Sequence, residues 1–299
     1  MTEMTPQTLS RAGVRVRAKG ASRWALAVML LLAASGCGPA EEEPEPFSPS
    51  TRSQELDSMN GLSANGLSAN GLSANGLSAN GLSANGLSAN GLSAENFASW
   101  FATNPALSDM VMRYIVRCAV PAGETRSYTD PQTGQSYSWS GNLGLAPDWA
   151  AGAPATTAEQ QVITACLMAH VNRYGLSIPI SVLGRDAHGE LIPYSIQELA
   201  TLSVREACFF GNLFTDEGLF FGVDRLISSD SAYLTRACAG MSSAQQCEPM
   251  QFVGACWLHC TPELLMPFYS RCTHNGVSYR AITTRMRVVD YEQLFQDAP

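Results

Sequence analysis

Cysteine is the residue type with the most chemistry in this chain, which has 299 residues and nine cysteines. All but one lie between positions 118 and 272, and thiols gathered in this way either pair as disulfides or bind a metal ion. An even number suits complete pairing in an oxidising compartment, so we predict four disulfides. The predicted disulfide cysteines are Cys118, Cys166, Cys208, Cys238, Cys247, Cys256, Cys260 and Cys272.

One pair can be assigned from the pattern of the surrounding residues. Cys118 and Cys166 each fall on the apolar face of a predicted helix, and helices pack through such faces. We therefore expect a disulfide between these two cysteines where the helices meet. Spacing alone does not determine how the other six cysteines pair.

A zinc site near the C-terminus is the alternative to complete pairing. Its ligands would come from Cys247, Cys256, His259, Cys260, Cys272 and His274. The intervals between these cysteines lack the Cys-x-x-Cys pairs that are common in structural zinc sites. The sequence therefore favours disulfides and predicts neither a metal ligand nor a cofactor.

No residue stands in a recognisable catalytic motif. His170 falls on the apolar face of a predicted helix and His188 lies in a polar turn, as is usual for structural histidines. The Gly-x-Ser-x-Gly elbow of α/β-hydrolases is absent from the chain. Lys19 is the only lysine, which excludes P-loop phosphate binding and Schiff-base catalysis by the rest of the chain. We predict no catalytic residue.

Paired carboxylates for glycoside hydrolysis are an open alternative, because their roles depend on their separation in space rather than in sequence. The acidic residues that lie near aromatic residues are Asp148, Glu206, Asp216 and Glu217. The aromatic residues Tyr128, Tyr137, Trp139 and Trp149 fall in a loop-rich stretch and could form a platform for stacking a ligand. Solvated surface acids and buried aromatic side chains are the commoner case for both groups.

The N-terminus has the layout of a secretory signal. A basic stretch from Arg11 to Arg23 precedes an apolar run from Trp24 to Ala34, which is too short to span a bilayer. The run ends in Ala33-Ala34-Ser35-Gly36-Cys37, which resembles the lipobox of bacterial lipoproteins. This resemblance implies removal of residues 1–36, lipidation of Cys37 and acylation of its new amino group. Gly38, in place of Asp, implies the outer membrane or the cell surface.

Removal of the signal would leave a strongly acidic protein. The chain has 18 Lys and Arg and 26 Asp and Glu, of which five basic residues and Glu3 lie in residues 1–36. The remainder would carry 13 basic against 25 acidic residues, a net charge of −12. Nucleic-acid binding rests on clustered Lys and Arg, so we exclude nucleic acid as a partner.

Two segments of low complexity follow Cys37. Residues 37–59 form an acidic, Pro-rich linker, and Asn-Gly-Leu-Ser-Ala then repeats seven times over residues 60–94. A period of five matches neither a strand nor a helix, and Asn-Gly favours turns, so we expect a spacer. A pentapeptide-repeat β-solenoid is the alternative, but the glycine before each leucine departs from that family's pattern.

Residues 95–299 have the composition of one globular domain. Helices are expected from Asn104 to Pro121, from Thr156 to Gly175 and over residues 196–209, from capping signals and apolar periodicity. Strands are expected at residues 126–129, 135–140, 178–183, 218–223, 251–257 and 278–288. Helices and strands do not alternate regularly, so we predict an α+β fold.

Three segments of this domain look like parts of uncharacterised lipoproteins from myxobacteria-like bacteria. They are residues 141–149, 165–175 and 206–214. This resemblance implies a disulfide-rich surface lipoprotein and supplies no catalytic residue.

Two hypotheses for function follow. The first is a membrane-anchored, noncatalytic lipoprotein whose domain binds a polysaccharide, peptide or protein, or serves a structural role in the cell envelope. The second is an envelope hydrolase that uses carboxylates or a dispersed triad. We prefer the first, because the chain contains no local catalytic motif.

Overall fold

The computed structural model describes residues 59–60, 82–171, 178–215, 217–224 and 250–296. The chain divides into two units, residues 1–48 and 49–299, and all described residues belong to the second unit. The predicted signal peptide, Cys37 and the acidic linker up to residue 58 therefore lie outside the described residues. In the part of the chain that is described, no helix is both long and apolar enough to cross a membrane.

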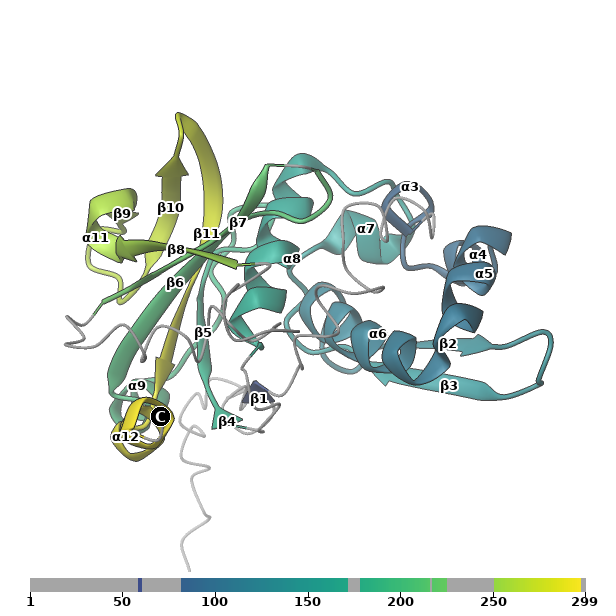
Figure 1. Ribbon diagram of the computed structural model, residues 1–299, viewed down its shortest axis with the longest axis horizontal. Helices are drawn as coiled ribbons and strands as arrows, with labels where there is room; N and C mark the ends of the chain where they lie inside the picture. The colour runs from purple at the N-terminus through teal and green to yellow at the C-terminus, as the bar shows by residue number, and fades with distance from the viewer. Residues whose placement is uncertain (1–58, 61–81, 172–177, 216, 225–249, 297–299) are drawn as a thin grey trace, which may run out of the picture. The chain divides into compact units, whose positions relative to one another are not determined.

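A seven-stranded sheet organises the C-terminal half of the domain (Figure 1). Its strand order is β8-β7-β6-β11-β10-β9, and β5 also pairs with β11. The strands are β5 (Ser181–Gly184), β6 (Val204–Asn212), β7 (Gly218–Val223), β8 (Met250–Ala255), β9 (Cys260–Pro262), β10 (Tyr269–His274) and β11 (Val277–Met286). All neighbours are antiparallel except β7 and β8. A short pair of strands, β1 (Met59–Asn60) and β4 (Ile178–Pro179), lies outside this sheet.

The two faces of the sheet carry different cores, because successive side chains of a strand point to opposite faces. Phe209 of β6 and Phe221 of β7 belong to the larger core, and helix α8 (Thr157–Ala169) packs against β6 and β11. Cys208 and Phe210 belong to a smaller core on the other side. This smaller core also contains Cys256, Cys260 and Cys272, so it is rich in sulfur.

The N-terminal half of the domain is built from helices and one β-hairpin. The helices are α5 (Glu95–Thr103), α6 (Pro105–Ala119), α7 (Pro147–Ala151) and α8, and the hairpin consists of β2 (Thr125–Thr129) and β3 (Ser136–Ser140). The Asn104 side chain caps α6 by accepting a hydrogen bond from the Leu107 N–H, and Pro105 is the first helical residue. Thr156 and Glu159 form the predicted capping box of α8. These helix starts and the hairpin are confirmed. Helix α8 ends at Ala169, and Gly175 lies outside the described residues.

The helix expected over residues 196–209 is wrong beyond its first part. The Ser195 capping box does start a helix, α9 (Ile196–Thr201), but this helix is short and β6 begins at Val204. Strand β6 lies between β7 and β11 and is buried on both faces. Its cysteine and two phenylalanines are apolar side chains that suit this burial. Tertiary packing therefore overrides the local helical signal.

The strand expected at residues 251–257 is cut short, because Cys256 begins a helical turn, α11 (Cys256–His259). The turn expected at Asn275-Gly276 is confirmed: both residues have positive φ, 49° and 79°, and join β10 to β11. Helix α12 (Val288–Gln296) follows β11.

The last repeats belong to the folded domain rather than to a spacer. Residues 82–94 form two helical turns, α3 (Leu82–Asn85) and α4 (Ala89–Leu92), and no strands, so the β-solenoid alternative also fails for them. The repeat leucines Leu82, Leu87 and Leu92 are at most 2% exposed and belong to the larger core. Residues 82–94 therefore pack with the domain that was expected to begin at residue 95. Residues 61–81 lie outside the described residues.

A repeat glycine explains why this segment can pack so closely. Gly86 has φ +71°, and an added Cβ would lie 2.4 Å from the Cα atom of Gly152. The Trp149 indole N–H donates to the Leu82 carbonyl at 2.7 Å, and the Leu87 N–H donates to the Trp149 carbonyl at 2.9 Å. The repeat glycine thus allows two backbone segments to approach each other, and the repeat leucines fill the core. Local periodicity reveals neither of these roles.

Three disulfides occur in the described part of the chain. Cys118 of α6 is bonded to Cys166 of α8, which is the pair expected from their helical faces. Cys208 is bonded to Cys256, and Cys260 to Cys272. Cys238 and Cys247 lie outside the described residues. The fold is therefore a disulfide-crosslinked α+β domain.

Candidate functional site

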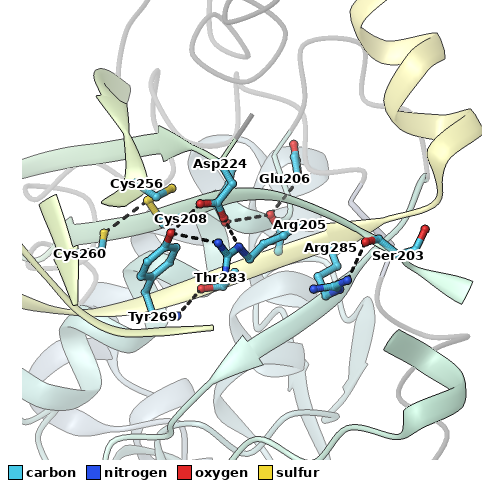
Figure 2. Close-up of polar contacts among 12 residues, drawn as sticks. Ser203, Arg205, Glu206, Cys208, Asp224, Cys256, Cys260, Tyr269, Thr283 and Arg285 are labelled. Atoms are coloured by element: carbon cyan, nitrogen blue, oxygen red, sulfur yellow. Dashed lines mark hydrogen bonds and ion pairs between the residues drawn. A yellow bond between two sulfur atoms is a disulfide. The ribbon is translucent and has the colours of Figure 1, made fainter. Parts of the chain in front are cut away.

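A cluster of polar side chains lies where three strands of the sheet begin or end (Figure 2). Arg205 is near the start of β6, Asp224 directly follows β7, and Tyr269 is the first residue of β10. The Tyr269 hydroxyl donates to Asp224 Oδ1 at 2.6 Å. Arg205 Nε lies 2.6 Å from Asp224 Oδ2, an ion-pair contact without hydrogen-bond alignment. Both oxygens of the Asp224 carboxylate are therefore engaged.

A second arginine faces the first across the sheet. Arg285 of β11 is the cross-strand partner of Arg205, and like charges in this position destabilise a sheet. Arg285 instead donates to the carbonyl oxygens of Leu202 at 2.8 Å and Ser203 at 2.6 Å. Asp224 supplies the negative charge that offsets this repulsion.

Burial shifts the protonation equilibria of the cluster. Burial raises the pKa of the Asp224 carboxyl, although the Tyr269 hydroxyl and Arg205 act in the opposite direction. The pKa of Tyr269 is raised, first by burial and then by its hydrogen bond to Asp224. Burial, and then the neighbouring Arg205, lowers the pKa of Arg285. Tyr269 is therefore a hydrogen-bond donor throughout the physiological range.

An open cavity of about 480 Å³ lies beside this cluster. It is lined by Ser203, Val204, Arg205, Asp224, Val288 and Glu292. The Asp224 side chain is only 5% exposed, whereas that of Arg205 is 38% exposed, so a ligand would meet the guanidinium first. Arg205 Nη2 donates a hydrogen bond to the Tyr269 hydroxyl at 3.3 Å. Among the described residues, none accepts a hydrogen bond from Arg205 Nη1. The cavity therefore offers a fixed cation with an available donor, which suits a carboxylate or a hydroxyl group.

The three described acids among those proposed for glycoside hydrolysis have separate partners. The His188 ring lies 2.9 Å from Asp148, and the Thr284 hydroxyl donates to the buried Glu206 at 2.8 Å. Glu217 accepts a hydrogen bond from Tyr279, and Asp216 lies outside the described residues. None of the described three lines the cavity beside Arg205.

The contact between His188 and Asp148 gives a measurable pH dependence. We expect an NMR titration to give His188 a pKa above 6.5, because its hydrogen bond to Asp148 favours the charged ring. A raised histidine pKa stabilises the fold below pH 6.5, and this contribution is lost as the pH rises through the raised value. Asp148→Asn should return the pKa towards its ordinary value, whereas Asp290→Asn should not. An unchanged pKa in Asp148→Asn would show that the contact does not form in solution.

The other histidines and the alternative zinc ligands are placed as follows. His170 is buried, and its Nδ1 lies 2.7 Å from the Cys166 carbonyl oxygen. The rings of His259 and His274 lie 5.8 Å apart, and burial lowers the pKa of His274. Three cysteines of the alternative zinc cluster are bonded in disulfides, and Cys256 is bonded to a residue outside that cluster. Cys247 is not among the described residues.

The aromatic residues proposed as a stacking platform are largely core residues. Trp139 and Trp149 are at most 1% exposed and Tyr128 is 6% exposed. Tyr137 is half-buried and packs against Phe101 of α5 with ring centroids 4.6 Å apart. The three rings of the hairpin therefore pack against α5, whereas Trp149 packs against Phe214.

Sequence reasoning missed the Arg205 cluster. The local pattern predicts a helix at Arg205, and nothing in the spacing of Asp224, Tyr269 and Arg285 connects these residues before the sheet is formed. The one available signal was the placement of charged residues directly beside predicted apolar strands, as at Asp224 after residues 218–223.

Comparison with known proteins matches only the repeat tract. The family model for the GLTT repeat matches residues 59–83 and 71–94, with six copies. No curated protein and no solved structure matches the chain.

Proposed function

We propose that the protein is a lipid-anchored extracytoplasmic lipoprotein whose α+β domain binds a carboxylate-bearing polysaccharide without catalysis. The signal and lipobox at residues 11–37 support the anchor and an outer-membrane or surface location. The acidic linker before β1 would serve as a spacer between the membrane and the domain. The resemblance to uncharacterised bacterial surface lipoproteins agrees with this placement.

Ligand binding is supported by one observation above all. Arg205 faces an open cavity while its counter-ion, Asp224, is held behind it by Tyr269. A guanidinium held in this way is oriented before the ligand arrives, which reduces the entropy cost of binding. Ser203 and Glu292 line the same cavity and suit the hydroxyl groups of a sugar.

The same contacts argue against hydrolysis. A general acid at Asp224 would need an oxygen that can reach the leaving group, but its two oxygens contact Tyr269 and Arg205. Incubation of the protein with hexuronate oligosaccharides should therefore leave their length unchanged. Shorter products that disappear in Asp224→Asn would replace the binding proposal with an envelope hydrolase.

The anchor predicts a defined N-terminal modification. Mass spectrometry of the membrane-extracted protein should find an N-terminal peptide that starts at Cys37 and carries a diacylglyceryl group. Cys37→Ser should release the protein from the membrane fraction, whereas Ser35→Ala should not, because it keeps a small residue in the lipobox. Recovery of residues 11–36 in the membrane-bound protein would refute lipidation.

The binding site predicts a charge-dependent affinity. In titration calorimetry, hexuronate oligosaccharides should bind and neutral glucose oligosaccharides of equal length should not. Arg205→Met should weaken binding by roughly 10- to 100-fold, because a hydrogen bond to a charged group contributes about 1.5–3 kcal/mol. Arg113→Met removes the same charge from an exposed position of α6 and should have no effect. Equal affinity of both variants would reject this cavity as the site.

A further inference from the structure

Two disulfides lie against each other in the smaller core of the sheet. Figure 2 shows Cys208 and Cys256, with Cys260 beside them. Cys208 is bonded to Cys256 and Cys260 to Cys272, and the Sγ atoms of Cys208 and Cys260 are 3.5 Å apart. All four cysteines are at most 6% exposed. The sulfur atoms thus form one buried group of four rather than two separate crosslinks.

This spacing is close to that of a tetrahedral metal site. A Zn–S bond of about 2.3 Å places neighbouring sulfurs of a Cys₄ site about 3.8 Å apart. The Sγ atoms of Cys208, Cys260 and Cys272 already lie within 4.8 Å of one another. Cys256, bonded to Cys208, supplies the fourth sulfur, so opening the two S–S bonds would leave four thiols around one point.

The sheet holds these residues in place from several directions. Cys208 comes from the central strand β6, whereas Cys260 and Cys272 are cross-strand partners on β9 and β10. Cys256 and Cys260 are one helical turn apart on either end of α11. Gly222 faces Cys208 across the strands, and an added Cβ there would lie 3.0 Å from the Cys208 sulfur. A glycine at this position leaves space beside the sulfur atoms.

We propose that the reduced form of Cys208, Cys256, Cys260 and Cys272 is a tetrathiolate site for Zn²⁺, and that oxidation to the two disulfides releases the ion. Two molecules of an external dithiol would donate four electrons and four protons, which gives four cysteine thiols and two oxidised dithiols. Zn²⁺ then binds the four thiolates and releases four protons. In the reverse direction, two external disulfides accept the four electrons and leave as thiols. Thiolate ligands favour zinc over magnesium or calcium.

The test measures zinc on the full chain in both redox states. The chain is reduced with a water-soluble phosphine, which takes one oxygen atom from water for each disulfide, and is then desalted without oxygen in the presence of zinc. Native mass spectrometry should find one zinc per reduced chain and none per oxidised chain. Cobalt in place of zinc should show the charge-transfer absorption of four thiolates.

Variants separate this site from adventitious binding. Cys208→Ser should weaken zinc binding at least about tenfold, since even residues outside the coordination sphere change metal affinity by that factor. The Cys118→Ser/Cys166→Ser and Cys238→Ser/Cys247→Ser double variants should each still bind one zinc. Should reduction unfold the chain, zinc should restore its circular dichroism spectrum. Absence of zinc on the reduced chain, failure of zinc to restore structure, or equal loss of zinc in the double variants would overturn the proposal.

Discussion

Deletion of residues 82–94 from the full chain is expected to unfold the domain. Burying a leucine side chain stabilises a fold by about 1.5–3 kcal/mol, and this segment buries Leu82, Leu87 and Leu92 in the larger core. Together these contributions are comparable to the total stability of a typical domain. The deletion would also remove the backbone contacts of the segment with Trp149.

Single substitutions make this test quantitative. Leu87→Ala should lower the free energy of unfolding by about 2–5 kcal/mol in urea titration, because it leaves a cavity in a closed core. Asn90 lies at an exposed position of the following repeat. Asn90→Ala should therefore change the free energy of unfolding by less than about 0.5 kcal/mol. Equal stability of Leu87→Ala and the unmodified chain would mean that the repeats act as a spacer up to residue 94.

Removal of the disulfide between Cys118 and Cys166 should be the next largest effect. This bond closes a loop with a sequence separation of 48 residues, and loop-closure entropy gives about 4 kcal/mol for that length. We expect Cys118→Ala/Cys166→Ala to lower the melting temperature by roughly 10 °C, measured by circular dichroism without reductant. Both side chains are fully buried between α6 and α8, so lost packing adds to the entropy effect.

A shorter loop provides the matched comparison. The disulfide between Cys260 and Cys272 spans only 12 residues, for which the same relation gives about 3 kcal/mol. Cys260→Ala/Cys272→Ala should therefore destabilise the domain less than Cys118→Ala/Cys166→Ala does. The reverse order would show that loop closure does not determine the contribution of these bonds.

Local signals in the sequence were sufficient for helix starts and turns. The Asn104-Pro105 start, the capping boxes at Thr156 and Ser195, and the Asn275-Gly276 turn all form as expected. Each depends on residues within three or four positions of one another, so their physical cause is present in the local sequence. The pairing of Cys118 with Cys166 also followed from helical periodicity, because both cysteines stand at buried apolar positions of their helices.

Tertiary structure decided what depends on distant neighbours. Residues 204–209 follow a capped helix, yet they form a central strand because β7 and β11 pair with them on both sides. A repeat with one leucine in five carries too little apolar character to predict burial. Leu87 nonetheless lies in the larger core, where its N–H donates to the Trp149 carbonyl and the neighbouring Gly86 closely approaches Gly152.

The candidate sites have the same origin. Arg205 lies in β6, Asp224 directly after β7 and Tyr269 in β10. The four clustered cysteines come from β6, α11, β9 and β10. The sequence determined the residue types available, and its predicted export signal makes disulfides the expected state. Only strand order and register, which are set by long-range pairing, brought the guanidinium to a cavity and four sulfur atoms to one point.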